Sequence, residues 1–382
     1  MLKFLLTIFL ILITSCHTHI NENVSKDVES RMQKFMVDKK ISGAVTLAYH
    51  KGNIIHHQAT GFANISTKEK MTTESLFRIA SLTKNVTAIS VMILQDRGKL
   101  SVNDKVSKHI PEYANLKVKD SNQLADLRIR HLMSHTSGII LPRNDDGSMT
   151  LKQVAVAGTS KPLIFTPGSQ WKYSRGLDVC AYIVENVSGS PFSDFLDKEI
   201  FLPLQMKDTG FYLNEEQVKR LVISYQPSKD GKHIIPSTLE RLVKPPVGKF
   251  TPGPSGGLIS SAQDMGRFYQ MLLNGGELDG KRIVSETSAK IIRQSQTGEN
   301  KAGFVPGSAW GLGFGLVQQP VGVSAMLNEG SFGHGGAFGT QGWVDPITET
   351  VYVLMIQRTK FGNSDASDVR LGFQQAVAEG IK

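Results

Sequence analysis

Residues 77–86 have the sequence Phe77-Arg78-Ile79-Ala80-Ser81-Leu82-Thr83-Lys84-Asn85-Val86. From Ser81 onward, apolar residues recur at the spacing of one helix face until Gly98, which predicts an amphipathic helix. Side chains three positions apart are neighbours on a helix surface, so the Lys84 amine should lie beside the Ser81 hydroxyl. An amine in that place can accept the hydroxyl proton and make the serine a nucleophile.

A serine and a lysine at this spacing do not by themselves identify a catalytic site. Serine is common at helix N-termini, and lysine is common on solvated helix faces. The hypothesis that Ser81 and Lys84 react therefore depends on partner motifs elsewhere in the chain.

Two other stretches contain residues that could act as partners of Ser81 and Lys84. In the first, the turn Pro167-Gly168 is followed by Tyr173 and then by a helix expected over 177–187, so the tyrosine should project from a loop. The second is Gly333-His334-Gly335-Gly336-Ala337, whose glycines allow a backbone to approach a strand or a substrate closely. Taken alone, Tyr173 is more often a buried aromatic residue, and His334 is more often structural.

The N-terminus predicts a secretory signal. Lys3 precedes an apolar run over residues 4–13 that is too short to span a bilayer. The run ends in Ile13-Thr14-Ser15-Cys16, which resembles the lipobox of bacterial lipoproteins. We expect residues 1–15 to be a signal peptide, Cys16 to carry the lipid, and residues 16–23 to be a tether. The protein would then be anchored in the cell envelope, at the outer membrane if the cell is Gram-negative; an ordinary signal peptide and secretion are the alternative.

The composition describes a globular chain. Of the 382 residues, 40% are hydrophobic and 20% are charged, which is enough apolar material for a large core. The net charge of +9 is spread without a block of like charges, so we predict no nucleic-acid partner. If Cys16 is lipidated, Cys180 is the only remaining thiol, and its apolar surroundings indicate a buried small residue.

Periodicity and turn residues predict the other elements. We expect helices over 24–39, 177–187, 191–200, 262–273, 285–293 and 365–378, and strands over 44–50, 54–60, 310–317, 341–345 and 350–357. Adjacent residues on a strand face opposite ways, so His56 and His57 should be structural. His131 and His135 have the spacing of a helical metal pair but lack a Glu between them or a third ligand, so we predict a helix cap and no metal.

Together the three clusters resemble the serine β-lactamase and penicillin-binding-protein superfamily. The likeness is to the class C β-lactamase-related branch, which also contains D-stereospecific peptidases and esterases. Its elements stand here in order as Ser81-x-x-Lys84, Tyr173-Ser174-x, and His334-Gly335-Gly336 where β-lactamases have Lys-Thr-Gly. The resemblance extends from about residue 24 to the C-terminus and includes the stretches 131–138, 203–211 and 256–265.

The resemblance implies an α+β fold, an antiparallel β-sheet flanked by helices together with a mainly helical region. The sheet region would comprise about 24–80 and 310–382 of a domain over 24–382, and the helical region about 81–309. Ser81 would form an acyl-enzyme without a cofactor or metal, and Lys84 and Tyr173 would carry its proton. The backbone N–H groups of Ser81 and Ala337 would hold the oxyanion, while His334, Gly335, Gly336 and Arg175 would bind the substrate.

Two departures from the β-lactamase pattern bear on the substrate. Arg175 replaces an asparagine that meets the substrate side chain, and His334 replaces a lysine that helps bind the β-lactam carboxylate. Both changes favour esters or small amides over penicillins. If Arg175 points inward, its charge beside Lys84 would lower the lysine pKa.

Three functions remain open at this stage. The first is a lipid-anchored serine hydrolase of esters or small amides. The second is a β-lactamase or D-Ala-D-Ala carboxypeptidase, acting on β-lactams or peptidoglycan peptides. The third is a non-catalytic envelope protein that binds through a relic cleft.

Overall fold

The computed structural model describes residues 19–121, 123–144, 146–248 and 251–382. The expected signal peptide and the lipidation of Cys16 therefore lie outside the described residues. Within those residues, no helix is both long and apolar enough to cross a bilayer.

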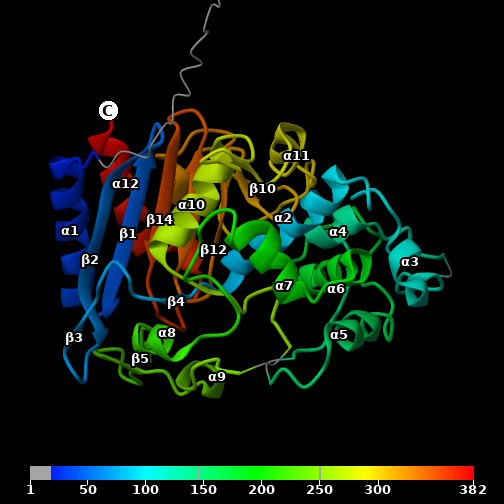
Figure 1. The fold of residues 1–382 in the computed structure, drawn as a ribbon, viewed down its shortest axis with the longest axis horizontal. Helices are drawn as coiled ribbons and strands as arrows, with labels where there is room; N and C mark the ends of the chain where they lie inside the picture. The colour runs from blue at the N-terminus through cyan, green and yellow to red at the C-terminus, as the bar shows by residue number, and fades with distance from the viewer. Residues whose placement is uncertain (1–18, 122, 145, 249–250) are drawn as a thin grey trace, which may run out of the picture.

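An eight-stranded antiparallel sheet forms one half of the molecule, with strand order β10-β11-β12-β13-β14-β1-β2-β3 (Figure 1). The strands are β10 (Ser308–Trp310), β11 (Gly315–Val317), β12 (Phe332–Gly335), β13 (Gln341–Asp345), β14 (Thr350–Met355), β1 (Gly43–His50), β2 (Asn53–Asn64) and β3 (Glu69–Lys70). The N-terminal and C-terminal parts of the sheet meet where β1 pairs with β14, for example Leu47 with Val353. The expectation of an antiparallel sheet built from both chain ends is confirmed.

Both faces of the central strands are buried, because helices cover each side. Val45 and Leu47 of β1 belong to one apolar core, and the alternate residues Ala44 and Ala48 belong to another. The second core lies under α1 (Glu22–Val37) and α12 (Asp368–Gly380), whereas α10 (Ala262–Leu273) packs on the opposite face (Figure 1). The alternation follows from the two-residue period of a strand.

A mainly helical region lies at the end of the molecule away from α1 (Figure 1). It is built around α2 (Thr83–Asp96), which packs against α6 (Gly176–Ser188) and α7 (Phe192–Leu196). The remaining helices there are α3 (Val106–His109), α4 (Ile129–Met133) and α5 (Leu151–Ala157), followed by the π-helical turn η3 (Asp197–Phe201).

The sequence predicts an amphipathic helix after Ser81, and this prediction is wrong in one respect. Every residue of α2 from Thr83 to Leu94 is buried, because the helix runs between the sheet region and the other helices. Its polar residues are paired instead of solvated. Thr87 donates to the Pro254 carbonyl at 2.7 Å, and Asn85 donates to the Gly313 carbonyl at 2.7 Å.

The single strand expected over 310–317 is also wrong. The chain turns back on itself at 311–314, so that β10 and β11 pair as a hairpin, with Trp310 opposite Gly315. Gly313 has a φ of 83° in this turn, which a side chain disfavours.

The described residues also form shorter elements. They are β4 (Phe77–Arg78), η1 (Ala80–Leu82), η2 (Pro111–Tyr113), α8 (Glu215–Lys219), β5 (Tyr225–Pro227), β6 (Ile234–Pro236), α9 (Glu240–Val243), β7 (Ile259–Ser260), β8 (Glu277–Leu278), β9 (Lys281–Arg282), α11 (Glu286–Ile291), η4 (Gly322–Ser324) and η5 (Ser364–Ala366). Among them, α9 packs close to the nucleophile segment, since Leu242 contacts Ala80 and Phe338.

Cys180 is buried, as predicted, and His56 is a buried structural residue. His56 bridges Ser25 of α1 (Oγ–Nδ1, 3.0 Å) and Thr46 of β1 (Oγ1–Nε2, 2.8 Å). Cys180 is fully buried in the apolar core around α6. Both residues therefore stabilise the packing between elements.

Candidate active site

Ser81 lies at a junction between the sheet region and the helical region. The strand β4 pairs with β7 and leads into the short helical turn η1, which places Ser81 just before α2. Ala80 has a φ of 48°, an uncommon value for a residue with a side chain. Ser81 remains partly exposed, although the residues on either side of it are buried, so its hydroxyl is accessible to a substrate.

Lys84 lies beside Ser81 on the first turn of α2. Its Nζ is 3.4 Å from Ser81 Oγ and donates to the Ser255 carbonyl at 2.6 Å. The side chain is buried, and burial lowers the pKa of Lys84 to about 7, while the Asp178 carboxylate opposes and the Arg175 guanidinium assists. A large share of the amine is therefore neutral near neutral pH, as a general base requires.

Tyr173 lies next to Lys84 and His334, on an irregular segment between α5 and α6. Its ring lies 4.8 Å from Lys84 Nζ, and its hydroxyl is 3.3 Å from His334 Nε2. Burial raises the pKa of Tyr173, and a hydrogen bond with Ser81 partly opposes the rise. The phenol is therefore protonated in the resting protein and can act as a proton donor.

His334 faces Tyr173 from β12 as a neutral imidazole. Burial, together with the nearby Lys84 charge, lowers the pKa of His334 to about 3. Its Nδ1 is 2.6 Å from the Gly335 carbonyl. A carbonyl can only accept, so Nδ1 carries the proton and Nε2 accepts from the Tyr173 hydroxyl.

The glycines after His334 bring β12 close to the nucleophile. A side chain at Gly336 would meet the Ile79 carbonyl at 2.6 Å, and one at Gly335 would meet Asp365 Oδ1 at 1.9 Å. Ala337 follows them; it is exposed, and its backbone N–H donates to no acceptor among the described residues. This N–H is free to bind an oxyanion.

Arg175 does not extend to Ser81. It forms an ion pair with Asp178 (2.6 Å) and donates to the Pro142 carbonyl at 2.8 Å. Asp178 is buried in α6, so the pair satisfies a charge that would be costly to leave alone. The alternative that Arg175 acts on Lys84 is supported only as an effect of charge, which lowers the pKa of Lys84.

Two groups at the site were missed from the sequence. The carbonyl of Ser255 holds Lys84, and His135 stacks against Tyr173 with ring centroids 4.4 Å apart. The spacing of His131 and His135 suggested one helix, but α4 ends at Met133 and His135 has a φ of 60°. The glycines and prolines around Ser255 were the only signal that this segment approaches another backbone closely.

His135 belongs to a group of packed rings, which we call the aromatic cluster. Its members are Tyr173, His135, Trp171, Phe304, Trp310 and His334. Neighbouring ring centroids lie within the range of aromatic pairing, such as 5.1 Å between His135 and Trp310 and 4.8 Å between Tyr173 and Phe304. The cluster holds the catalytic candidate Tyr173 in one orientation.

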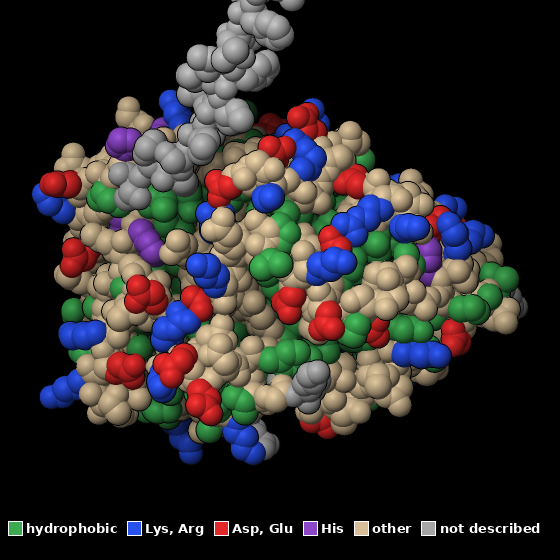
Figure 2. Space-filling view, in the orientation of Figure 1, with side chains coloured by type: hydrophobic (Ala, Val, Ile, Leu, Met, Phe, Trp, Pro, Cys, Tyr) green, Lys and Arg blue, Asp and Glu red, His purple; other side chains and the backbone are tan. Residues whose placement is uncertain are grey.

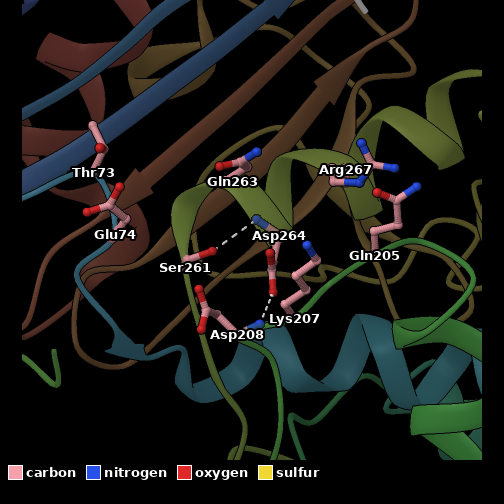
Figure 3. A pocket seen from close by; sticks show the side chains of 9 residues that line it. All are labelled: Thr73, Glu74, Gln205, Lys207, Asp208, Ser261, Gln263, Asp264 and Arg267. Atoms are coloured by element: carbon pink, nitrogen blue, oxygen red, sulfur yellow. Dashed lines mark hydrogen bonds between the residues drawn. The ribbon is translucent and has the colours of Figure 1, made fainter. Parts of the chain in front are cut away.

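A polar hollow of about 230 Å³ lies elsewhere in the molecule, beside the N-terminus of α10 (Figure 3). Asp264 accepts hydrogen bonds there from the Asp208 N–H and the Thr209 hydroxyl, each at 2.8 Å. Burial raises the pKa of Asp264 to about 6. The bonds fasten the segment around residue 208 to α10, and the hollow contains none of the residues around Ser81.

Neither the charges on the face shown in Figure 2 nor the metal-binding groups among the described residues indicate a second site. Lysine and arginine side chains are interspersed with acidic ones on the face shown in Figure 2. Across the part of the chain that the structure describes, no group of three or more His, Cys, Asp and Glu side chains could hold a metal ion.

Comparisons with known proteins point to one family. A family model described as Beta-lactamase matches residues 28–377. Esterase EstB of Burkholderia gladioli is 30% identical over 85% of this chain and 88% of its own length. Protein Rv1367c of Mycobacterium tuberculosis is 28% identical over 86% of this chain and 88% of its own.

A solved structure shares the fold. EstCE1, a hydrolase with promiscuous acyltransferase activity, superposes with a TM-score of 0.80 over 94% of this chain and 99% of its own. The sequence identity is 23%, so this likeness concerns the fold alone.

Proposed function

Because the chain belongs to the Beta-lactamase family of serine hydrolases, we propose that it hydrolyses esters or small amides through an acyl-enzyme on Ser81. The observation that carries the proposal is the position of Lys84, whose buried amine lies 3.4 Å from Ser81 Oγ and whose pKa is lowered to about 7. Intact Ser81, Lys84 and Tyr173 argue against a relic cleft.

The proposed reaction begins with Ser81 Oγ attacking the substrate carbonyl carbon while neutral Lys84 takes the hydroxyl proton. The N–H groups of Ser81 and Ala337 hold the oxyanion that forms. As the bond to the leaving group breaks, Tyr173 donates its proton to the departing oxygen or nitrogen and regains one from Lys84. Water then attacks the acyl-enzyme by the reverse sequence, which releases the acid and restores Ser81.

The lack of a free positive charge at His334 or Arg175 supports esters over β-lactams. A β-lactamase lysine would offer a positive charge to the β-lactam carboxylate, but His334 stands there and is neutral because burial lowers its pKa to about 3. Arg175 is held by Asp178 and the Pro142 carbonyl. The name of Esterase EstB, a relative over most of the chain, points the same way.

A substrate panel tests this choice. With a chromogenic short-chain ester and a chromogenic cephalosporin assayed side by side, we expect the kcat/KM for the ester to exceed that for the cephalosporin by about 10- to 100-fold. That factor corresponds to one lost hydrogen bond to a charged group. Comparable turnover of the cephalosporin would favour the β-lactamase or carboxypeptidase alternative. A protein that neither turns over an ester nor reacts with a fluorophosphonate would be the non-catalytic alternative.

We also propose that the enzyme is anchored in the cell envelope through Cys16. The support is the signal-like run over residues 4–13 and the sequence Ile13-Thr14-Ser15-Cys16. Labelling of growing bacteria with radioactive palmitate should mark the wild-type protein in the membrane fraction, and Cys16→Ser should lose the label. Equal labelling of both proteins would contradict the anchor.

A further inference from the structure

We propose that the rim of the aromatic cluster, formed by Phe304 and Trp171, binds the leaving group and selects esters of aromatic alcohols such as benzyl alcohol. This inference rests on the proposed function, because it uses Tyr173 as the proton donor to the departing oxygen. It adds the class of alcohol that the site accepts.

The aromatic cluster has a buried base and an open rim. Trp310 is 3% exposed and His135 is fully buried, whereas Trp171 is half-buried and Phe304 is 38% exposed. Phe304 is thus the most exposed ring of the cluster, although its centroid lies only 4.8 Å from that of Tyr173 and 5.8 Å from that of Trp171. A large exposed ring beside a reacting group provides apolar surface that a substrate can cover.

The segment that carries Phe304 is tied down on both sides of the cleft. It connects α11 to β10, and Asn300 Nδ2 donates to the Gly168 carbonyl at 3.4 Å, next to the Tyr173 segment. On the sheet side, Asn363 Nδ2 donates to the Phe304 carbonyl at 2.6 Å. The backbone that carries the Phe304 ring is therefore fastened before a substrate arrives, which reduces the entropy lost on binding.

Protonation of the leaving group by Tyr173 brings that group to this rim. A proton donor must lie within about 2.6–3.2 Å of the atom that it protonates, so the departing oxygen contacts the Tyr173 hydroxyl. The group attached to that oxygen then extends along the rings next to Tyr173. A phenyl ring one methylene away from the oxygen can pair with Phe304 at the spacing that the cluster already uses.

The rim presents ring surface and no accessible polar group of its own. The ring nitrogens His135 Nε2, Trp171 Nε1 and Trp310 Nε1 have no hydrogen-bond partner among the described residues and are out of reach of solvent. A leaving group therefore meets carbon atoms and ring edges, which favours a neutral aromatic group over a charged or strongly hydrated one.

The test compares esters of one acid that differ only in the alcohol. Benzyl, cyclohexylmethyl and ethyl acetate separate an aromatic ring from an aliphatic ring of similar size and from no ring, and ethyl phenylacetate moves the aromatic ring to the acyl side. The variants are Phe304→Ala and Phe304→Leu, with Ile347→Ala as the control. Ile347 is 70% exposed in the turn between β13 and β14. This turn follows the last residue of β13, whereas Gly335 of β12 pairs with Gln341, the first residue of β13.

We expect the wild type to prefer benzyl over cyclohexylmethyl acetate. Phe304→Ala and Phe304→Leu should each lower kcat/KM for benzyl acetate by about three- to tenfold, the contribution of one aromatic pair. Ethyl acetate should change by less than about twofold in both variants, and Ile347→Ala should change none of the esters.

Three results would overturn the inference. They are equal rates for the benzyl and cyclohexylmethyl esters, an equal loss for every ester in Phe304→Ala, and a loss confined to ethyl phenylacetate. If a fluorophosphonate still labels Ser81 in these cases, only the leaving-group assignment fails. If the wild type is neither labelled nor active on any ester, the proposed function itself fails and this inference falls with it.

Discussion

Replacing Ser81 with alanine is expected to abolish labelling by a fluorophosphonate and to lower ester turnover by at least about 10⁴-fold. Loss of the nucleophile from a serine hydrolase removes the covalent route, and what remains comes from the oxyanion donors and substrate binding alone. The partly exposed position of Ser81 and its contact with Lys84 are the structural reasons for naming it. Steady-state kinetics with a chromogenic ester and mass spectrometry of the labelled protein measure the two effects.

Ser169→Ala is the matched control for this variant. Ser169 is exposed on the Tyr173 segment, and its hydroxyl donates only to the nearby Thr166 carbonyl. It should keep full labelling and turnover. Activity that survives in Ser81→Ala, or a label found on another serine, would remove Ser81 as the nucleophile while leaving the fold and family untouched.

Lys84→Arg is expected to lower kcat/KM for the same ester by about 10³-fold, within the range that a general base contributes. The variant keeps the positive charge, but a guanidinium does not give up its proton at any pH that proteins tolerate. Lys84→Met, which removes the charge and keeps an unbranched side chain, should lose a similar factor. Thermal unfolding followed by circular dichroism shows whether either variant still folds.

The pH dependence of the wild type follows from the same residue. Burial lowers the pKa of Lys84 to about 7, so the neutral base is present above that pH and is lost below it. We therefore expect kcat/KM to rise about tenfold per unit up to pH 7 and then to level off. A limb near pH 10 would contradict the assignment, since an unperturbed lysine titrates there. Lys172→Arg, an exposed position next to Tyr173, should leave the profile unchanged.

Local patterns predicted most of the helices and strands, because the spacing of apolar residues directly reflects the helix and strand periods. The hairpin of β1 and β2 and the helices α1, α6 and α10 all appear where expected, within a few residues at their ends. Periodicity could not reveal that α2 is buried on all sides. In the sequence, its polar residues have the pattern of a solvated face. In the structure they donate hydrogen bonds to the carbonyls of Pro254 and Gly313, which are far along the chain.

The sequence likewise identified the residues of the candidate site but not their charge states. Spacing placed Lys84 beside Ser81, and motif order added Tyr173 and His334 to the hypothesis. The charge states of these groups depend on burial and on neighbours distant in sequence. Examples are the low pKa of Lys84, the neutral imidazole of His334, and the pairing of Arg175 with Asp178 instead of with the cleft.

The sequence by itself determined the positions of most helices and strands, since these depend on local periods. Motifs kept in order determined the resemblance to the family and the residues proposed to react, and the resemblance in turn implied the antiparallel sheet. Only the tertiary structure decided which groups hold and tune those residues. Ser255, His135 and Phe304 reach the site from three separate segments, and no short-range pattern records a contact between residues so far apart in the chain. Desolvation is likewise a property of the assembled core, and it is what makes Lys84 a base at neutral pH.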